Sequence, residues 1–65
     1  MSSLINKISE DKAIVMEDFI LYAYGTTYLY EIGDIISNKK VIDIIEREEK
    51  FAMDDDVVIV RRNIN

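Results

Sequence analysis

Carboxylates are the most numerous side chains in this sequence that could take part in chemistry. There are thirteen acidic residues against eight basic ones, and Asp54, Asp55 and Asp56 are consecutive. Carboxylate oxygens bind hard cations such as Ca²⁺. Adjacent side chains in a tight turn seldom converge on one ion, however, and no EF-hand spacing surrounds these three. We therefore expect a solvated turn at 54–56 and no metal site.

Residue types that usually carry catalysis are missing from the chain. It contains no histidine and no cysteine, so a Ser-His-Asp triad, a Cys-His pair and a thiolate metal site are excluded within it. There is also no glycine-rich phosphate loop, and no nucleophile has a base nearby. We expect a protein that is not an enzyme and that uses no cofactor.

Two other groups of side chains are suited to binding. Glu46, Glu48 and Glu49, together with the three aspartates, could form an acidic strip that imitates a row of phosphates in the basic groove of a partner. Tyrosine also occurs four times in nine positions, and exposed tyrosines favour interfaces. The alternatives are a solvated acidic face and tyrosines that are partly buried in the core. The four tyrosines are Tyr22, Tyr24, Tyr28 and Tyr30.

Length and charge limit the architecture that can position these groups. A chain of 65 residues forms one small domain, and such a domain buries only about 60% of the surface of its unfolded chain. The net charge of −5 repels nucleic acid at long range. The longest apolar run, 19–24, is too short to span a bilayer, and the first residues lack the pattern of a secretory signal. We expect residues 1–65 to be a single cytoplasmic domain without a membrane segment, with residues 1–10 as a candidate helical extension.

Apolar residues before Gly25 recur at intervals of three and four. This spacing predicts one long helix or two short ones with a single buried face. Gly25 suits the left-handed residue that closes a helix. The apolar stripe is also available for a homodimer interface. Its members in that interface are Ile5, Ile8, Val15 and Phe19.

A β-hairpin is the competing interpretation of residues 19–32. The segment is rich in β-branched and aromatic residues on both sides of Gly25 and Thr26. The sequence leaves the choice between helix and hairpin open.

The second half of the chain predicts two further helices and two strands. Leu29, Ile32 and Ile36 have helical spacing, and so do Val41, Ile44 and Ile45 after a turn or N-cap at Ser37-Asn38. Two extended segments, 51–53 and 57–60, flank the aspartate turn. The second of them is the clearest strand, because it consists of four β-branched residues.

The order helix, helix, turn, helix, hairpin resembles the winged helix-turn-helix family. Residues 27–37 resemble its second helix, 41–51 its third, and the turn at 54–56 the tip of its wing. The resemblance covers about three quarters of the chain, from Ala13 to Arg62. It implies a mainly α fold with a small C-terminal β-hairpin; the alternative is an α+β fold of ββαβ type.

The same resemblance implies a DNA-binding transcriptional regulator that acts as a homodimer. Its third helix, about 38–50, would enter the major groove, and the two arginines after the last strand would reach a flanking phosphate. The implied DNA-binding residues are Asn38, Lys39, Lys40, Arg47, Arg61 and Arg62. The alternative is an acidic adaptor or inhibitor that binds a protein with a basic surface, such as a nucleic-acid enzyme.

Overall fold

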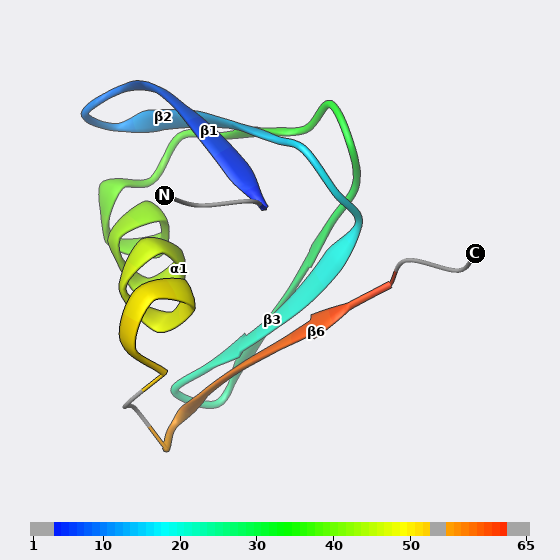
Figure 1. Cartoon of the computed structure of the whole chain (residues 1–65), viewed down its shortest axis with the longest axis vertical. Helices are drawn as coiled ribbons and strands as arrows, with labels where there is room; N and C mark the ends of the chain where they lie inside the picture. Colours follow the sequence, from blue (N-terminus) through cyan, green and yellow to red (C-terminus); the bar gives the residue numbers. More distant parts are fainter. Residues whose placement is uncertain (1–3, 53–54, 63–65) are drawn as a thin grey trace.

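The computed structural model describes residues 4–52 and 55–62. These residues form two three-stranded antiparallel sheets, β1–β2–β5 and β4–β3–β6, with a helix packed beside them (Figure 1). In chain order the elements are β1 (Ile5–Ser9), β2 (Lys12–Val15), β3 (Phe19–Ala23), β4 (Thr26–Tyr30), β5 (Ile35–Ile36), α1 (Lys39–Phe51) and β6 (Val57–Arg61).

A two-residue turn at Tyr24 and Gly25 connects β3 to β4, and Ala23 lies opposite Thr26 across it. Both turn residues have positive φ, 51° and 80°. This is the type I′ geometry that matches the twist of paired strands, and glycine suits its second position. The hairpin alternative for residues 19–32 is therefore confirmed, and the helix predicted before Gly25 is wrong.

Burial in β2 and β3 has a period of two rather than 3.6. The buried side chains occupy odd-numbered positions on both sides of Glu17, and the intervening residues face away from the core. Such alternation is typical of a strand that has one face packed against the core and the other face directed away from it. The spacing of three and four arose from counting across separate strands. The buried residues are Ala13, Val15, Phe19, Leu21 and Ala23.

The second predicted helix, over residues 27–37, is also wrong. This segment contains β4, a tight loop and the two-residue strand β5. The Asp34 carboxylate accepts a hydrogen bond from the Glu31 N–H at 2.8 Å, and the Asp34 N–H donates to the Glu31 carbonyl at 3.0 Å. Gly33, at φ 94°, completes the loop and donates to the Val15 carbonyl. The loop thereby joins the two sheets.

The helix predicted after Ser37-Asn38 is confirmed as α1. Asn38 is its N-cap, and its side-chain oxygen accepts hydrogen bonds from the backbone of Lys40 and Val41 at 3.0 and 3.3 Å. These bonds satisfy backbone donors that a helix start leaves unpaired. The apolar stripe of α1 buries Val41, Ile42 and Ile45 against the sheets.

The strand predicted at 57–60 is confirmed as β6, but its partner differs from the expectation. It pairs with β3, 34 or more positions earlier in the chain, and not with a segment at 51–53. Phe51 belongs to α1, and Met53 lies outside the described residues. The predicted C-terminal hairpin and its wing are therefore wrong.

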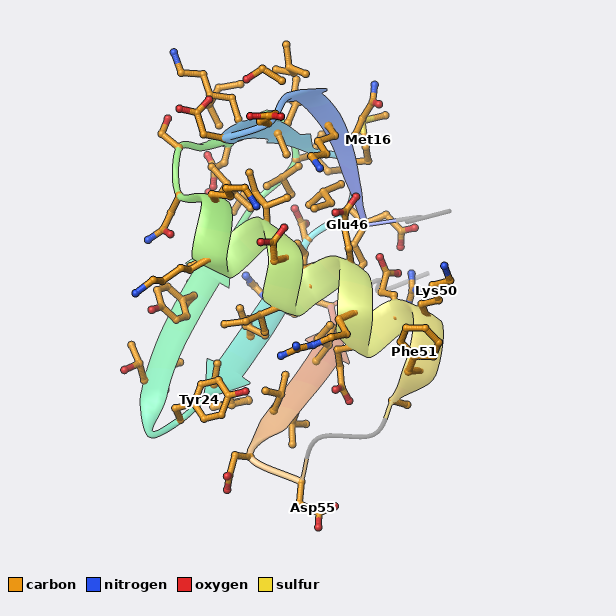
Figure 2. The ribbon with its side chains drawn as sticks, turned by 90° about the vertical axis from the view of Figure 1, so that its left-hand side faces the viewer. Met16, Tyr24, Glu46, Lys50, Phe51 and Asp55 are labelled. Carbon is orange, nitrogen blue, oxygen red and sulfur yellow. The ribbon has the colours of Figure 1, made fainter. Side chains whose placement is uncertain are left out.

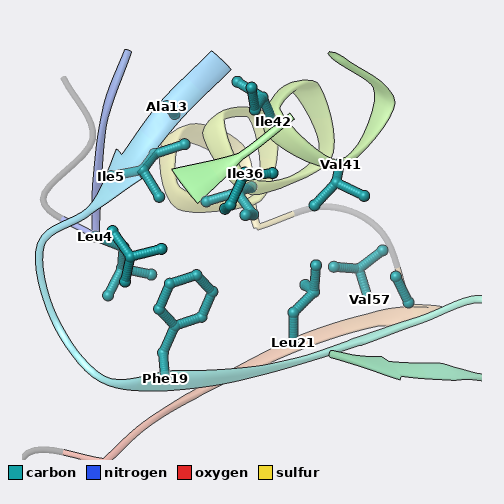
Figure 3. Close-up of a cluster of buried hydrophobic side chains, with 12 residues drawn as sticks. Leu4, Ile5, Ala13, Phe19, Leu21, Ile36, Val41, Ile42 and Val57 are labelled. Carbon is teal, nitrogen blue, oxygen red and sulfur yellow. The ribbon is translucent and has the colours of Figure 1, made fainter. Parts of the chain in front are cut away.

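One apolar core lies between the two sheets and the helix (Figure 3). Its largest fully buried side chains come from both sheets, from α1 and from the residue before β1. They are Phe19, Leu4, Leu21, Ile42, Ile45 and Val15. None of the short elements could cover its apolar side alone, so the core forms only when all of them meet.

These observations overturn the resemblance to winged helix-turn-helix proteins. That fold needs three helices, whereas the described residues contain one helix and are mostly strands. The fold is mainly β, and the predicted mainly α class with a C-terminal hairpin is wrong. The ββαβ alternative also has too few strands. Residues 5–9, predicted as part of a helical extension, form β1.

Candidate protein-binding surface

The side of the β4–β3–β6 sheet that faces away from the core carries six side chains, which we call the outer face. Across β3, Leu29 and Val60 lie on either side of Ile20, and Thr27 and Val58 lie on either side of Tyr22. These two rows of three follow directly from the strand register. The outer face thus consists of Ile20, Tyr22, Thr27, Leu29, Val58 and Val60.

The outer face is apolar and open to solvent. Leu29 is 62% exposed, Val58 50%, Val60 43% and Tyr22 42%. None of the six residues is Asp, Glu, Lys or Arg. Antiparallel sheets that face water on one side usually place polar residues there, and contiguous exposed apolar patches mark interaction surfaces. This surface therefore has the character of a face that is covered in a complex.

The four tyrosines divide between the two sides of the β3–β4 hairpin. Tyr28 and Tyr30 pack against the core, with ring centroids 6.1 Å apart and nearly parallel planes, and the Tyr30 ring centre lies 5.3 Å from that of Phe19. Burial, followed by the proximity of Tyr28 and Asp34, raises the pKa of Tyr30. Tyr22 and Tyr24 are exposed. Partial burial in the core is thus confirmed for Tyr28 and Tyr30, whereas an interface role for Tyr22 and Tyr24 stays a prediction.

Acidic groups border the outer face on β3, β4 and the adjoining loops. The chain contains no lysine or arginine from position 13 to position 38, and the ionisable acids in that interval are Glu17, Asp18, Glu31 and Asp34. The Asp18 carboxylate accepts a hydrogen bond from the Ile32 N–H at 2.9 Å, which brings it to the Tyr30 end of the sheet. At the opposite end, the Tyr24 N–H donates to the Asp56 carbonyl, and Figure 2 shows Tyr24 and Asp55 at that end.

The residues implied to bind DNA do not form a single patch. Asn38, Lys39 and Lys40 are adjacent at the start of α1, but the Asn38 side chain is engaged as the helix cap. Arg47 lies on the exposed side of the helix about 12 Å farther along its axis, at 1.5 Å per residue.

The other two arginines of this set, Arg61 and Arg62, lie elsewhere. Arg61 reaches Glu17 and Glu49, both at 3.2 Å, and the Arg62 N–H donates to the Asp18 carbonyl. The Arg61 guanidinium, which was expected to reach a phosphate, therefore forms ion pairs with two carboxylates of the chain itself. DNA binding stays a prediction that a mobility-shift titration tests.

The predicted homodimer residues are mostly internal. Ile5, Val15 and Phe19 are at most 3% exposed and belong to the chain's own core, whereas Ile8 is 60% exposed. Three of the four could meet a second chain only if the core opened.

The Lys39–Asp43 ion pair gives a pH-dependent prediction. Lys39 Nζ donates to Asp43 Oδ2 at 2.9 Å; this bond lowers the pKa of Asp43 below 3.8 and raises that of Lys39 above 10.5. A lowered carboxyl pKa stabilises the fold above that ordinary value, and the contribution is lost as pH falls through the folded pKa. A raised lysine pKa stabilises below 10.5, and its contribution is lost as pH rises through the folded pKa. Between pH 3.8 and pH 10.5 we expect Asp43→Asn to lower Tm slightly. At a pH below the folded pKa of Asp43, the variant and wild type should have the same Tm.

A double-mutant cycle with Lys39→Gln provides the control for this pair. The effects of the two single variants should not add, because either change removes the same bond. Additive effects, or a Tm difference that persists in strong acid, would contradict the assignment.

The acidic side chains and the helix of the described residues bear on the predictions about metal ions and membrane segments. They contain no cluster of three or more acidic side chains placed to hold a metal ion. Of the predicted aspartate turn, Asp55 and Asp56 are exposed, and Asp54 lies outside the described part. Within that part, no helix has the length and apolar character needed to cross a bilayer.

Comparisons with protein-family models, with curated proteins and with solved structures find no match to this chain. The surface itself must therefore supply the argument for function. Sequence reasoning missed the outer face, although a signal for it was present. The apolar run 19–24 contains the β3 residues of both faces, and a strand that is apolar on both faces is one that is covered on both.

Proposed function

We propose that this protein is a binding module for another polypeptide and that the outer face is its contact surface. The observation that supports this proposal is the exposure of Leu29, Val58, Val60 and Tyr22 together on one uncharged sheet face. Apolar and aromatic side chains are what the buried centre of a protein interface contains. The acidic groups around the face favour a partner with a basic surface.

The size of the outer face sets a limit on what it can do alone. Three strands about 4.8 Å apart and five residues of about 3.4 Å each give a face of about 14 by 17 Å. At about 25 cal/mol per Å², covering it contributes about 6 kcal/mol. Association costs about 4–15 kcal/mol in lost freedom. A stable complex therefore needs contacts beyond the outer face, either at its rim or at a strand edge.

A pair of matched double variants tests the proposal. Leu29→Glu with Val58→Glu places two charges in the outer face, whereas Ile32→Glu with Ile35→Glu places two charges at positions that are 66% and 52% exposed outside it. All three proteins are immobilised, and extracts of the source cell are passed over them. We expect one protein to be retained in stoichiometric amount by wild type and the control, and to be lost from the outer-face variant.

Circular dichroism establishes that both variants are folded. If the outer-face variant does not fold, covalent footprinting of wild type with and without the retained protein replaces it, and labelling of Tyr22, Leu29 and Val58 should fall. Equal retention by both variants, retention of nucleic acid alone, or unchanged labelling would overturn the proposal.

A further inference from the structure

Among the strands that the structure describes, three of the four sheet edges carry features that disfavour pairing with another strand. In β1 the edge contains Lys7 and a register shift between Lys7 and Ser9. The β5 edge is two residues long. In β6 the edge ends in Arg61 and runs beside α1. Charged side chains, bulges, short strands and covering elements are the usual protections of an edge.

The β4 edge has none of these protections. Its five residues, Thr26–Tyr30, include no charge and no proline, and all five are in continuous register with β3. Within the described residues β4 pairs with β3 on one side only, and it is the outermost strand in Figure 2. The β4 edge can therefore form backbone hydrogen bonds with one more strand.

The hairpin geometry identifies the backbone groups that point outward from β4. In a hairpin with a two-residue turn, the residues that flank the turn, here Ala23 and Thr26, form a hydrogen-bonded pair. Hydrogen-bonded and non-hydrogen-bonded pairs then alternate along the ladder. The N–H and C=O groups of Thr27 and Leu29 therefore point away from β3. Beyond them, Asp34 already engages both backbone groups of Glu31.

Charge selects the kind of strand that fits this edge. Glu31 and Asp34 lie at its Tyr30 end, whereas Asp55 and Asp56 precede β6 and lie on the opposite side of β3. No basic residue occurs in β3, β4 or β5. The β4 edge of a second copy offers no basic residue to these acids. A strand with basic residues beside Tyr30 would face opposite charge at that end, and basic residues at both of its ends provide this in either strand direction.

We propose that the partner contributes an extended, apolar segment flanked by lysine or arginine, which adds to the sheet as a strand along β4. This proposal rests on the proposed function and adds the form and charge of the bound segment. Thr27 and Leu29 exchange backbone hydrogen bonds with the segment. Alternate side chains of the segment lie beside the Leu29 and Thr27 side chains and extend the outer face. These backbone hydrogen bonds supply the additional contacts at a strand edge that a stable complex needs beyond the outer face.

Removal of one backbone donor tests the proposal with a defined probe, the peptide Lys-Lys-Val-Thr-Val-Thr-Val-Lys-Lys. Thr27→Pro removes the outward N–H without removing a bond to β3, whereas Thr27→Ala keeps that N–H and removes the side chain. We expect Thr27→Pro to bind the peptide about tenfold more weakly than Thr27→Ala does, because both variants lose the side chain and only the first also loses one hydrogen bond. Equal binding by the two variants would overturn the proposal.

Amide hydrogen exchange of wild type gives a second measurement that does not depend on the folding of the proline variant. Saturating peptide should slow exchange at Thr27 and Leu29 and leave the outward amides of β6, at Val57 and Ile59, unchanged. The same peptide with glutamate in place of lysine should bind more weakly, and added salt should weaken the lysine peptide. Protection at β6 instead of β4, or indifference to the peptide's charge, would overturn the proposal.

Two outcomes separate this inference from the proposed function. In the first, the Leu29→Glu, Val58→Glu variant no longer retains the cellular partner, but that partner does not slow amide exchange at Thr27 and Leu29 of wild type. The proposed function then stands and strand addition is wrong. If sedimentation shows a dimer of the chain alone, with Thr27 and Leu29 protected only at concentrations where it forms, the occupant is a second copy and the basic segment is wrong.

Discussion

Replacement of Phe19 with alanine is expected to destabilise the fold by about 3–5 kcal/mol. The Phe19 side chain is completely buried and packs against the Tyr30 ring in the core between the two sheets. Alanine would leave a cavity there that neighbouring strands could not close without breaking register. A domain of this size has a total stability on the order of 3–10 kcal/mol. Urea denaturation followed by circular dichroism should therefore show a midpoint lowered by about 30% or more.

Phe51 provides a control of the same residue type. Its side chain is 54% exposed, and the only ring interaction it makes within the described residues is with Lys50 Nζ, 5.4 Å from the ring centre. Such an exposed cation–π contact contributes about 0.5–1 kcal/mol. We expect Phe51→Ala to lower stability by no more than this. Similar losses in the two variants would show that the core is not where the structure places it.

Replacement of Ile42 with alanine should destabilise the protein by about 2–5 kcal/mol and should affect the helix and the sheets together. Ile42 is completely buried and belongs to the same core cluster as Phe19 and Leu21. The helix has 13 residues, and an isolated helix of that length is marginal in water. We expect helical and tyrosine circular dichroism signals to be lost in one transition at a lower urea midpoint.

Ile32→Ala is the matched control for this change. The Ile32 side chain is 66% exposed in the loop before β5, so its truncation should change stability by less than about 0.5 kcal/mol. Two separate transitions in the Ile42 variant would contradict a single shared core, and so would an effect equal to that of the control.

The elements that the sequence predicted correctly are those defined by local interactions. The Asn38 side chain caps α1 through the backbone N–H groups of residues only two and three positions ahead. The spacing of Val41 and Ile45 sets the buried face of the same helix. The β-branched residues of β6 favour an extended backbone whatever they pair with. The identity of the β6 partner could not be predicted, because Phe19 lies 42 positions before Arg61 and no local signal connects them.

The first half of the chain was mispredicted because β3 is apolar on both faces. Ile20 and Tyr22 occupy the outer face between the core residues Phe19, Leu21 and Ala23. Their apolar character conceals the alternation that a half-solvated strand would show. The property that obscured the fold is therefore also the property that defines the candidate binding surface.

The implied DNA-binding residues illustrate a second limit of sequence analysis. Lys39 and Arg61 are basic and lie near the ends of their elements, as a phosphate-binding role requires. Which carboxylate each one meets depends on tertiary structure, however. Asp43 is one turn along the helix from Lys39, whereas Glu17 approaches Arg61 from a distant part of the chain. Only the first of these pairs is visible as an i,i+4 spacing.

The late position of β6 affects how the nascent chain can fold on the ribosome. The central strand β3 and its turn emerge from the exit tunnel well before the residues of β6, and until those arrive β3 has only β4 beside it. At about 5–20 residues per second, this interval lasts a few seconds. During it the edge of β3 that later pairs with β6 is unpaired, and another extended chain could occupy it. The sheet is thus completed only after β6 has been synthesised, and its rate is set by a long-range encounter rather than by local hairpin formation.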